Sequence, residues 1–294
     1  MKMKIYQDEP LLKHCSFKIG GNAEYVYYPE TADELIGLIK KFNSEKQEYY
    51  VFGNASNVLF PDESLRKSVV FTTEMKDIRL VGNTIIAEAG VTLNTLSAFA
   101  RDNVLTGLEF AYGIPGTVGG GVYMNAGAYG GQLSDIVINC RAIDSEGEIC
   151  NLNATELRFG YRHSVLQEKK LILIDSTLNL KSGDKTTIIE QMDTYMSKRK
   201  GCQPLNFPSA GSVFKRPQNN YTGALIEKAG LKGMTVGGAM VSEKHAGFII
   251  NTGDATAKDV RELIDIIKAR VFEQSGVMLE CEVCIIENNK NRKL

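Results

Sequence analysis

The sequence predicts an α+β protein built from two or three domains. Its 294 residues exceed what one hydrophobic core usually serves. Segments with apolar residues at helical spacing alternate with short strands separated by turns. A doubly wound sheet is not expected, because no G-x-G-x-x-G motif follows a strand and the chain has no Walker lysine loop.

The composition is that of an ordinary globular protein, with 43% hydrophobic and 23% charged residues. The net charge of −1 gives no overall field that would attract nucleic acid or an acidic membrane. No apolar run approaches the roughly 20 residues of a membrane span, and the first residues lack the apolar core of a signal peptide. We therefore expect a cytoplasmic protein without nucleic acid or membrane partners, and by default a monomer.

The six cysteines are too sparse for a secreted disulfide scaffold, so reduced thiols are expected. Cys281 and Cys284 form a C-x-x-C motif, which raises the question of zinc or redox chemistry. The segment around them alternates like a strand, where residues three apart point to opposite faces. Because there is no second C-x-x-C and no histidine pair at ligand spacing, no metal site is predicted.

The first half of the chain alternates helices and short strands. Thr31 is expected to cap a helix, with Glu34 as its capping-box partner. A second helix is expected after Thr92. The buried stripe of the first helix would be Leu35, Leu38, Ile39 and Phe42. Strands are expected at residues 49–52, 69–72 and 84–89, and a hairpin at 136–143 and 148–152.

The second half begins with a strand at 171–180 and a helix at 187–200, and residues 201–208 look like a boundary. A short helix runs from Thr222 to Gly230. The last helix has Thr256 as its cap and ends at Gly276. Its buried stripe would be Val260, Leu263, Ile264, Ile267 and Val271. A strand that carries Glu280 and Glu282 follows.

Residues 113–131 are dense in glycine, which loses more backbone entropy on folding than any other residue. Such a segment usually lets the backbone approach a ligand, with bare N–H groups turned toward phosphate oxygens or a polarised ring. A second small polar loop, residues 53–57, follows a predicted strand. The two loops favour a large ligand with a diphosphate between them. The alternative is a run of tight turns in an all-β region.

Six motifs follow one another along nearly the whole chain. They are Gly-Asn-Ala-Ser-Asn-Val-Leu (53–59), Ile-Pro-Gly-Thr-Val-Gly-Gly (114–120), Met-Asn-Ala-Gly-Ala-Tyr-Gly (124–130), Phe-Gly-Tyr-Arg-His-Ser (159–164), Ala-Gly-Ser-Val-Phe-Lys (210–215) and Leu-Glu-Cys-Glu-Val (279–283). In this order they closely resemble the UDP-N-acetylenolpyruvoylglucosamine reductases (MurB), flavoenzymes of bacterial cell-wall synthesis.

The resemblance implies three domains. Two bind FAD in the manner of the vanillyl-alcohol oxidase (PCMH-type) superfamily, and a C-terminal α+β domain closes over the sugar nucleotide. On this basis the FAD-binding subdomains would be residues 1–67 and 68–200, and the substrate domain residues 201–294. The final strand either stays in the substrate domain or returns to the FAD-binding part.

The resemblance also implies the reaction of a UDP-N-acetylmuramate dehydrogenase in peptidoglycan synthesis, and with it a role in cell shape and division. NADPH reduces a non-covalently bound FAD and leaves. UDP-N-acetylglucosamine enolpyruvate then takes its place and accepts hydride from flavin N5. None of the three histidines lies in the glycine-rich loops, which argues against a covalent flavin. The expected FAD-binding residues are Gly53, Asn54, Ala55, Ser56, Asn57, Ile114, Pro115, Gly116, Thr117, Gly119, Gly120, Asn125, Ala126 and Gly127.

This chemistry needs a cation or strong donor for the developing enolate and an acid that protonates the carbon. By the resemblance, Arg162 matches the family's enolate-stabilising arginine and Ser212 its proton-donating serine. Glu282 matches a glutamate that helps to stabilise the intermediate in protonated form, and burial would raise its pKa. Glu280 is its rival, because residues two apart share one face of a strand.

The substrate's diphosphate also needs cations. The candidate cations are Lys198, Arg199, Lys215 and Arg216, and Lys215, which lies inside the serine motif, is favoured. The expected substrate-binding residues are Tyr161, Lys215, Arg216 and His245. Tyr161 is expected to pack with its ring rather than to act as an acid.

The chain departs from the family pattern at a few positions. Ala55 stands where glycine is common, and Gly121 where alanine is common. Cys281 and Cys284 replace a common proline and arginine. A substrate-covering tyrosine loop of one family branch is absent, so the chain resembles the second, shorter type. Two other functions stay open: a different flavin oxidase or dehydrogenase on the same fold, and a catalytically silent nucleotide-sugar binder.

Overall fold

The computed structural model describes residues 3–288, so the outer ends of the first and last predicted domains lie outside the described residues. The N-terminal part forms a four-stranded sheet in the order β1-β2-β5-β3. Its strands are β1 (Lys4–Pro10), β2 (Asn22–Tyr28), β3 (Tyr49–Phe52) and β5 (Ser68–Phe71). β5 runs parallel to both β2 and β3. A domain boundary after residue 67 would cut this sheet, so the predicted boundary falls too early.

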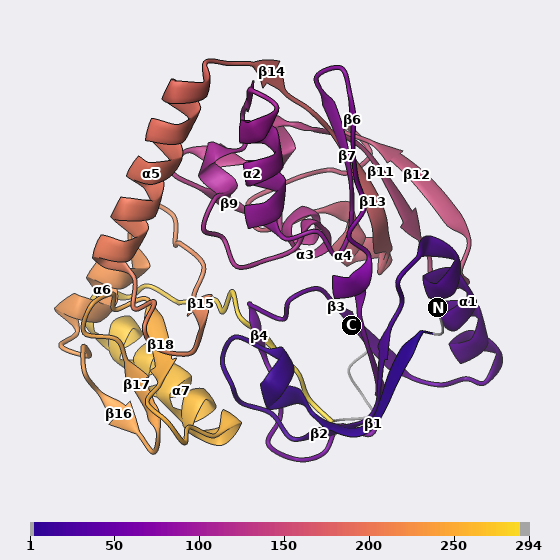
Figure 1. Cartoon of the computed structure of the whole chain (residues 1–294). Helices are drawn as coiled ribbons and strands as arrows, with labels where there is room; N and C mark the ends of the chain where they lie inside the picture. Colours follow the sequence, from indigo (N-terminus) through magenta and orange to yellow (C-terminus); the bar gives the residue numbers. More distant parts are fainter. Residues whose placement is uncertain (1–2, 289–294) are drawn as a thin grey trace.

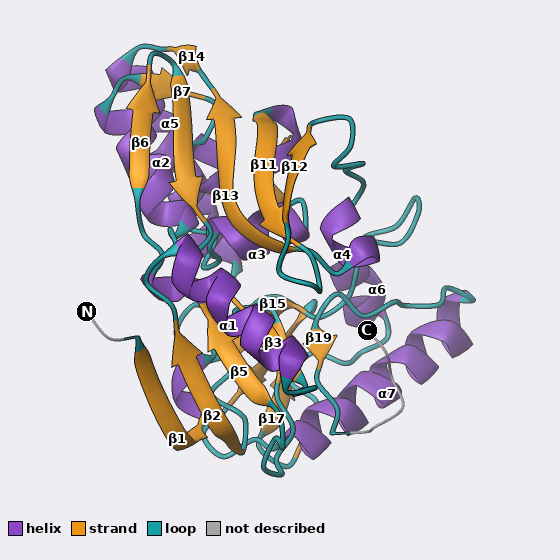
Figure 2. Cartoon of the chain, turned by 90° about the vertical axis from the view of Figure 1, so that its right-hand side faces the viewer, coloured by secondary structure: helices purple, strands orange, loops and turns teal. Residues whose placement is uncertain are grey.

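Helix α1 (Ala32–Ser44) covers one face of this sheet (Figure 2). All four residues of its predicted stripe are buried, in one core with Tyr27 and Val70. Thr31 caps the helix, because its Oγ1 accepts a hydrogen bond from Glu34 N at 3.2 Å. The Glu34 carboxylate accepts from Glu30 N at 2.8 Å, so the predicted capping box closes one residue earlier than expected.

The middle of the chain forms a five-stranded antiparallel sheet in the order β12-β11-β13-β7-β6. Its strands are β6 (Ile78–Val81), β7 (Thr84–Glu88), β11 (Val137–Ile143), β12 (Ile149–Asn153) and β13 (Ile172–Asn179). This confirms the predicted hairpin. The helices are α2 (Leu93–Asp102), α3 (Val118–Tyr123), α4 (Val165–Lys169) and α5 (Lys185–Cys202). Helices α2 and α5 lie side by side next to this sheet (Figure 1).

The C-terminal part forms a third sheet in the order β15-β18-β17-β16. Its strands are β15 (Ser209–Ser212), β16 (Thr235–Val236), β17 (Ala239–Val241) and β18 (Phe248–Asn251), and its helices are α6 (Thr222–Lys228) and α7 (Ala257–Ser275). The predicted cap of α7 is confirmed, since Thr256 and Asp259 form a capping box. Its predicted stop is also confirmed, because Gly276 takes a φ of 69°.

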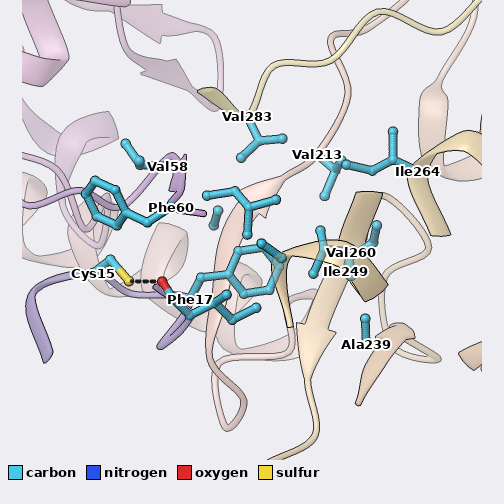
Figure 3. Packing of buried hydrophobic residues seen from close by; sticks show 14 of the residues in the cluster. Cys15, Phe17, Val58, Phe60, Val213, Ala239, Ile249, Val260, Ile264 and Val283 are labelled. Carbon is cyan, nitrogen blue, oxygen red and sulfur yellow. Dashed lines mark hydrogen bonds between the residues drawn. The ribbon is translucent and has the colours of Figure 1, made fainter. Parts of the chain in front are cut away.

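The first and third sheets share one hydrophobic core (Figure 3). Phe17 and Phe60 from the N-terminal part are buried in the same cluster as Val213, Ile249 and Val260. The Asp62 carboxylate also accepts hydrogen bonds from the first backbone N–H groups of α7, at 2.7 and 3.1 Å. The middle sheet has a separate core. The N- and C-terminal parts therefore pack together around one core, and the middle part has a core of its own.

Six further two-residue strands of the described chain form three pairs, β9 with β10, β14 with β8 and β19 with β4. They are β4 (Val58–Leu59), β8 (Leu105–Thr106), β9 (Gly127–Ala128), β10 (Gly131–Gln132), β14 (Lys181–Ser182) and β19 (Cys284–Ile285). β19 pairs with β4 in parallel, which favours the alternative in which the last strand returns to the N-terminal part. The expectation of a strand through Glu280 and Glu282 was wrong, since regular pairing begins only at Cys284. In the described part of the chain, no helix is long and apolar enough to cross a membrane.

Candidate functional site

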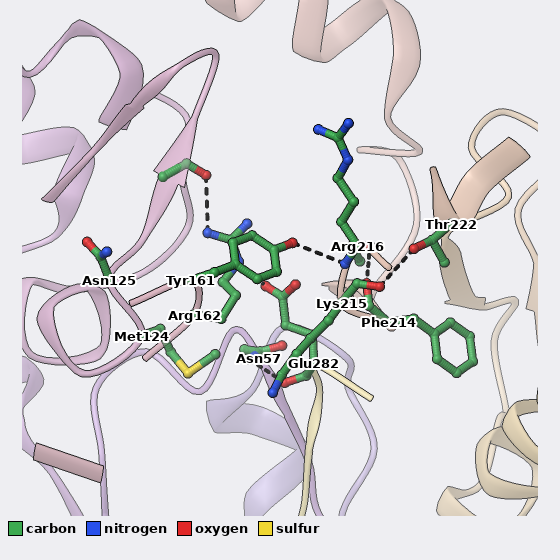
Figure 4. A network of polar contacts seen from close by, with 12 residues as sticks. Asn57, Met124, Asn125, Tyr161, Arg162, Phe214, Lys215, Arg216, Thr222 and Glu282 are labelled. Atoms are coloured by element: carbon green, nitrogen blue, oxygen red, sulfur yellow. Dashed lines mark hydrogen bonds and ion pairs between the residues drawn. The ribbon is translucent and has the colours of Figure 1, made fainter. Parts of the chain in front are cut away.

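Arg162 and Glu282 meet between the middle and C-terminal parts of the chain (Figure 4). Arg162 Nε lies 2.8 Å from Glu282 Oε1, and the two side chains are 23% and 14% exposed. The Nε–H is not aligned on this oxygen, so the contact is an ion pair without a well-directed hydrogen bond. The Nη1 group donates weakly to Gly127 O at 3.4 Å. The guanidinium therefore retains donors for a further acceptor.

A tight turn holds Arg162 in place. Gly160 and His163 exchange backbone hydrogen bonds at 3.0 and 3.3 Å around it. Arg162 itself has a φ of 55°, in the left-handed region that favours glycine. The turn therefore fixes the backbone from which the Arg162 side chain reaches Glu282.

Burial raises the pKa of Glu282 above its ordinary value, although Arg162 and, more weakly, Lys215 oppose the rise. Its backbone bridges two neighbours. Glu282 N donates to Val213 O at 2.8 Å, and Asn57 Nδ2 donates to Glu282 O at 3.0 Å. The residue is thereby tied to both the serine motif and the small polar loop.

Ser212 lies one residue from this backbone contact, at the end of β15. Its hydroxyl is partly buried and donates only weakly, to Phe214 O at 3.4 Å. Gly211 has a φ of 75°, and a Cβ on Gly247 would lie 3.4 Å from Ser212 Oγ. The hydroxyl thus sits among glycines, where a ligand can approach it.

Glu280 does not share a face with Glu282, contrary to the prediction. The Glu280 side chain is 72% exposed and pairs with Lys215. The reason is that the backbone of Glu282 bonds to Val213 through its N–H and to the Asn57 side chain through its carbonyl, and does not pair regularly with one strand. Residues two apart therefore need not share a face here. Glu282 is the carboxyl group that faces Arg162.

The two glycine-bearing loops are in direct contact. A Cβ on Gly53 would lie only 2.1 Å from Thr117 Oγ1, so this approach requires glycine. Asn54 Nδ2 donates to Pro115 O at 2.8 Å. Thr117 is buried and caps α3, which carries Gly119 and Gly120. Together the loops form a strip of backbone suited to a diphosphate group.

Two predicted cofactor residues have a more specific role. Ala55 has a φ of 41°, and its methyl group is buried in the shared core. This explains why glycine is expected there, and the buried methyl offsets part of the strain. The Asn125 side chain is 3% exposed and donates to Gly160 O at 3.0 Å. It therefore supports the Arg162 turn, and only the backbone of Asn125 remains for a cofactor.

Tyr123 and Cys284 border the same region. Both side chains are exposed, yet desolvation by the surrounding protein raises the pKa of each. Cys284 N donates to Asn57 O at 2.9 Å, so Cys284 lies next to the small polar loop.

A cavity of about 310 Å³ adjoins this loop and includes residues that sequence analysis missed. Besides Gly53 and Asn54, its lining contains Lys13, His14, Cys15, Ser16 and Lys18. His14 bonds Glu9 through Nε2 at 2.9 Å and the Tyr28 hydroxyl through Nδ1 at 2.7 Å. The signal in the sequence was one histidine and two lysines within residues 13–18. The search for glycine-rich loops did not detect this segment, because it contains no glycine.

A second cavity, of about 420 Å³, brings together three of the predicted substrate-binding residues: Tyr161, Lys215 and Arg216. Arg216 N donates to the Tyr161 hydroxyl at 3.1 Å (Figure 4). His245 does not line this cavity. Its Nδ1 accepts from Gly247 N at 3.2 Å, which puts it near Ser212, and burial lowers its pKa.

Arg199 is more unusual than the sequence suggests. It is 7% exposed, its Nη1 donates to Gln203 Oε1 at 3.2 Å, and among residues 3–288 it has no carboxylate partner and its Nε no hydrogen-bond partner. Its guanidinium carbon lies 5.6 Å from the centre of the Tyr129 ring, and a Cβ on Gly113 would lie 2.9 Å from Nε. A buried cation without a counter-ion is costly, so this position suits an anionic ligand.

No group of three or more His, Cys, Asp or Glu side chains in the described residues could hold a metal ion. What the arrangement offers is a backbone strip for phosphates, a cation beside a carboxyl of raised pKa, and a nearby hydroxyl. These groups suit the addition of hydride and proton to a polarised double bond.

Two family models match the chain. The FAD binding domain matches residues 23–153. The C-terminal domain of UDP-N-acetylenolpyruvoylglucosamine reductase matches residues 203–286.

Whole-chain relatives agree with these models. The UDP-N-acetylenolpyruvoylglucosamine reductase of Caldanaerobacter subterraneus is 46% identical and that of Levilactobacillus brevis 48%, over 96% and 97% of this chain and 94% and 93% of the relatives. The crystal structure of UDP-N-acetylenolpyruvylglucosamine reductase from Thermus caldophilus matches with a TM-score of 0.82 at 35% identity, over 98% of this chain and 100% of that one.

Proposed function

Since this chain belongs to the UDP-N-acetylenolpyruvoylglucosamine reductase family, we propose that it converts UDP-N-acetylglucosamine enolpyruvate to UDP-N-acetylmuramate with NADPH as reductant. It is a flavoprotein oxidoreductase of peptidoglycan precursor synthesis. The contact between Arg162 and Glu282, with Ser212 beside it, is the observation that carries the proposal.

The glycine-bearing loops would hold FAD. Their fit rests on the Gly53 approach to Thr117, which leaves no room for a side chain, and on the bond between Asn54 and Pro115. When bound, FAD would take hydride from NADPH and supply it to the methylene carbon of the enolpyruvyl group. The lysines and His14 of the 310 Å³ cavity extend this proposed site.

Arg162 would bind the carboxylate of the enolpyruvyl group and stabilise the negative charge that develops on it. The guanidinium is already oriented by its turn and by Glu282, so little reorganisation is needed when the charge appears. Glu282, whose pKa is raised by burial, would contribute a proton-bearing carboxyl on the same side.

Ser212 would donate the proton that completes the reaction. A hydroxyl is a weak acid, but a carbanion-like enolate is basic enough to take its proton. Within residues 3–288 the Ser212 hydroxyl makes only a long hydrogen bond to Phe214 O, so its proton is available. His245, near Gly247, belongs to this side of the proposed site.

Lys215, Arg216 and Tyr161 would bind the diphosphate of the sugar nucleotide, because they line one cavity and Lys215 is close enough to Glu282 to lower its pKa. Arg199, a buried cation with no carboxylate partner among the described residues, would interact with a second anionic part of a nucleotide ligand. We also propose that the protein is cytoplasmic and monomeric. It would have three domains, with the first boundary after β5, because β5 belongs to the first sheet.

Mixing the purified yellow protein with NADPH and UDP-N-acetylglucosamine enolpyruvate should consume NADPH, seen as loss of nicotinamide absorbance, and yield the lactyl ether. A reaction without the enolpyruvyl substrate is the control. Colourless protein that binds the sugar nucleotide without turnover would support a silent binder instead. Flavin that stays with acid-precipitated protein would indicate a different, covalent flavoenzyme.

A further inference from the structure

The 420 Å³ cavity contains one acidic side chain among its described lining residues, Glu280, opposite the cations Lys215 and Arg216. Lys215 Nζ lies 2.5 Å from Glu280 Oε1. A carboxylate in a site for a polyanion is unfavourable once the polyanion arrives, so its presence calls for an explanation.

The backbone fixes this pair independently of the two charges. Lys215 N donates to Glu280 O at 2.9 Å, and the adjacent residues Phe214 and Cys281 form an isolated β-bridge. Glu280 is therefore held beside Lys215 even when the side chains change partners. Replacing its carboxylate by an amide should leave the local fold intact.

The ion pair itself is easily broken. Lys215 is 31% exposed and Glu280 72% exposed, and pairs at such positions contribute little to stability. Arg216 is more firmly engaged, because its guanidinium carbon stacks 3.9 Å from the centre of the Tyr221 ring and its Nε donates to Asn220 O at 3.2 Å. Lys215 is thus the cation of this cavity that can change partner at low cost.

We propose that Glu280 is a displaceable counter-ion, which holds Lys215 until the diphosphate of a nucleoside-diphosphate ligand takes its place. The inference rests on the proposed function and adds a residue that sets the selectivity of the same site. A diphosphate offers more charge and more acceptor oxygens than Glu280, whereas a ligand without phosphates leaves the Lys215–Glu280 pair closed. Glu280 therefore makes the site selective for a diphosphate but lowers the affinity for that diphosphate.

The test uses UDP as the probe and calorimetric titration of the FAD-loaded protein. Glu280→Gln should lower the Kd for UDP about fivefold at low salt, and the difference should shrink at high salt. The Kd for uridine should not change. Glu227→Gln is the matched control, because Glu227 pairs with Lys232 at 2.9 Å with similar exposure, 60% and 34%, outside the lining of this cavity.

An unchanged or higher Kd for UDP in Glu280→Gln would overturn the inference. Repeating the substitution in a Lys215→Met background separates release of the ammonium from simple loss of a negative charge. The gain should then largely disappear, and an equal gain would also contradict the counter-ion role. Measuring turnover of the unmodified protein distinguishes a failure of the proposed function from a failure of this inference. Tighter UDP binding without turnover would refute the proposed function alone, and turnover without tighter binding would refute this inference alone.

Discussion

Substituting Arg162 by methionine should destabilise the protein by about 2 kcal/mol near pH 8 and by much less near pH 5. The magnitude follows from the burial of the Arg162–Glu282 pair, whose side chains are 23% and 14% exposed. Exposed pairs are worth about 0–1 kcal/mol, and removing one partner of a fully buried pair costs about 3–5 kcal/mol, so this pair falls between. Methionine keeps Cβ and the stem, so the strain at a φ of 55° stays the same.

The pH dependence follows from the Glu282 pKa. Burial already raises it, and Arg162 is the strongest opposing influence, so the variant's pKa rises further. A carboxyl with a raised pKa in the folded state costs stability when it is ionised. That cost is therefore fully present above the folded pKa and disappears as the pH falls toward the unfolded value, about 4.5.

Thermal unfolding with FAD in fixed excess measures the effect, because a bound ligand also shifts the midpoint. A loss of about 2 kcal/mol corresponds to roughly 4 °C for a chain of this size. Arg101→Met, which breaks the adjacent-residue pair with Asp102, is the matched control and should change the midpoint little. Equal destabilisation at both pH values, or the same pH dependence in a Glu282→Gln background, would refute the electrostatic explanation.

Three further predictions test the geometry. Gly53→Ala puts a Cβ 2.1 Å from Thr117 Oγ1 and should weaken FAD binding at least about tenfold in a fluorescence titration, and wild-type affinity would contradict the proposed loop contact. Asn125→Ala removes the bond to Gly160 O and should lower kcat about tenfold with FAD affinity unchanged, whereas loss of FAD with normal kcat would mean a direct cofactor role. Lys170→Gly, at the left-handed C-cap of α4, should stabilise the protein by about 0.5–1 kcal/mol in thermal unfolding. Lys169→Gly, at the last residue of the helix, is the control and should destabilise it. The reverse order of stabilities would refute the capping argument.

Helix positions were predictable because their signals are local. The caps Thr31 and Thr256 and the stripes behind them define α1 and α7 within the sequence itself. Helix α5 begins two residues earlier than predicted because Asp184, whose side chain accepts from Thr187 N, caps it. The strand predicted through Glu280 and Glu282 failed because pairing partners, not alternation, decide whether a segment becomes a strand.

The candidate site was predictable only as a set of motifs. The resemblance named Arg162, Ser212 and Glu282, but nothing in the sequence gives the 2.8 Å approach of two residues separated by 120 positions. Tertiary packing produces three further features: the left-handed conformation of Arg162, the supporting role of Asn125 and the burial of Arg199. Such features follow from contacts between distant segments, which local patterns do not encode.

Stopped-flow spectroscopy of Ser212→Ala tests the role of the site most directly, because the flavin colour separates the two half-reactions. Bleaching by NADPH should keep its normal rate, whereas return of the yellow colour on adding the enolpyruvyl sugar nucleotide should slow by about a thousandfold. If both phases slow equally, or if recolouring stays fast, then this hydroxyl does not deliver the proton and the assignment of the site is wrong.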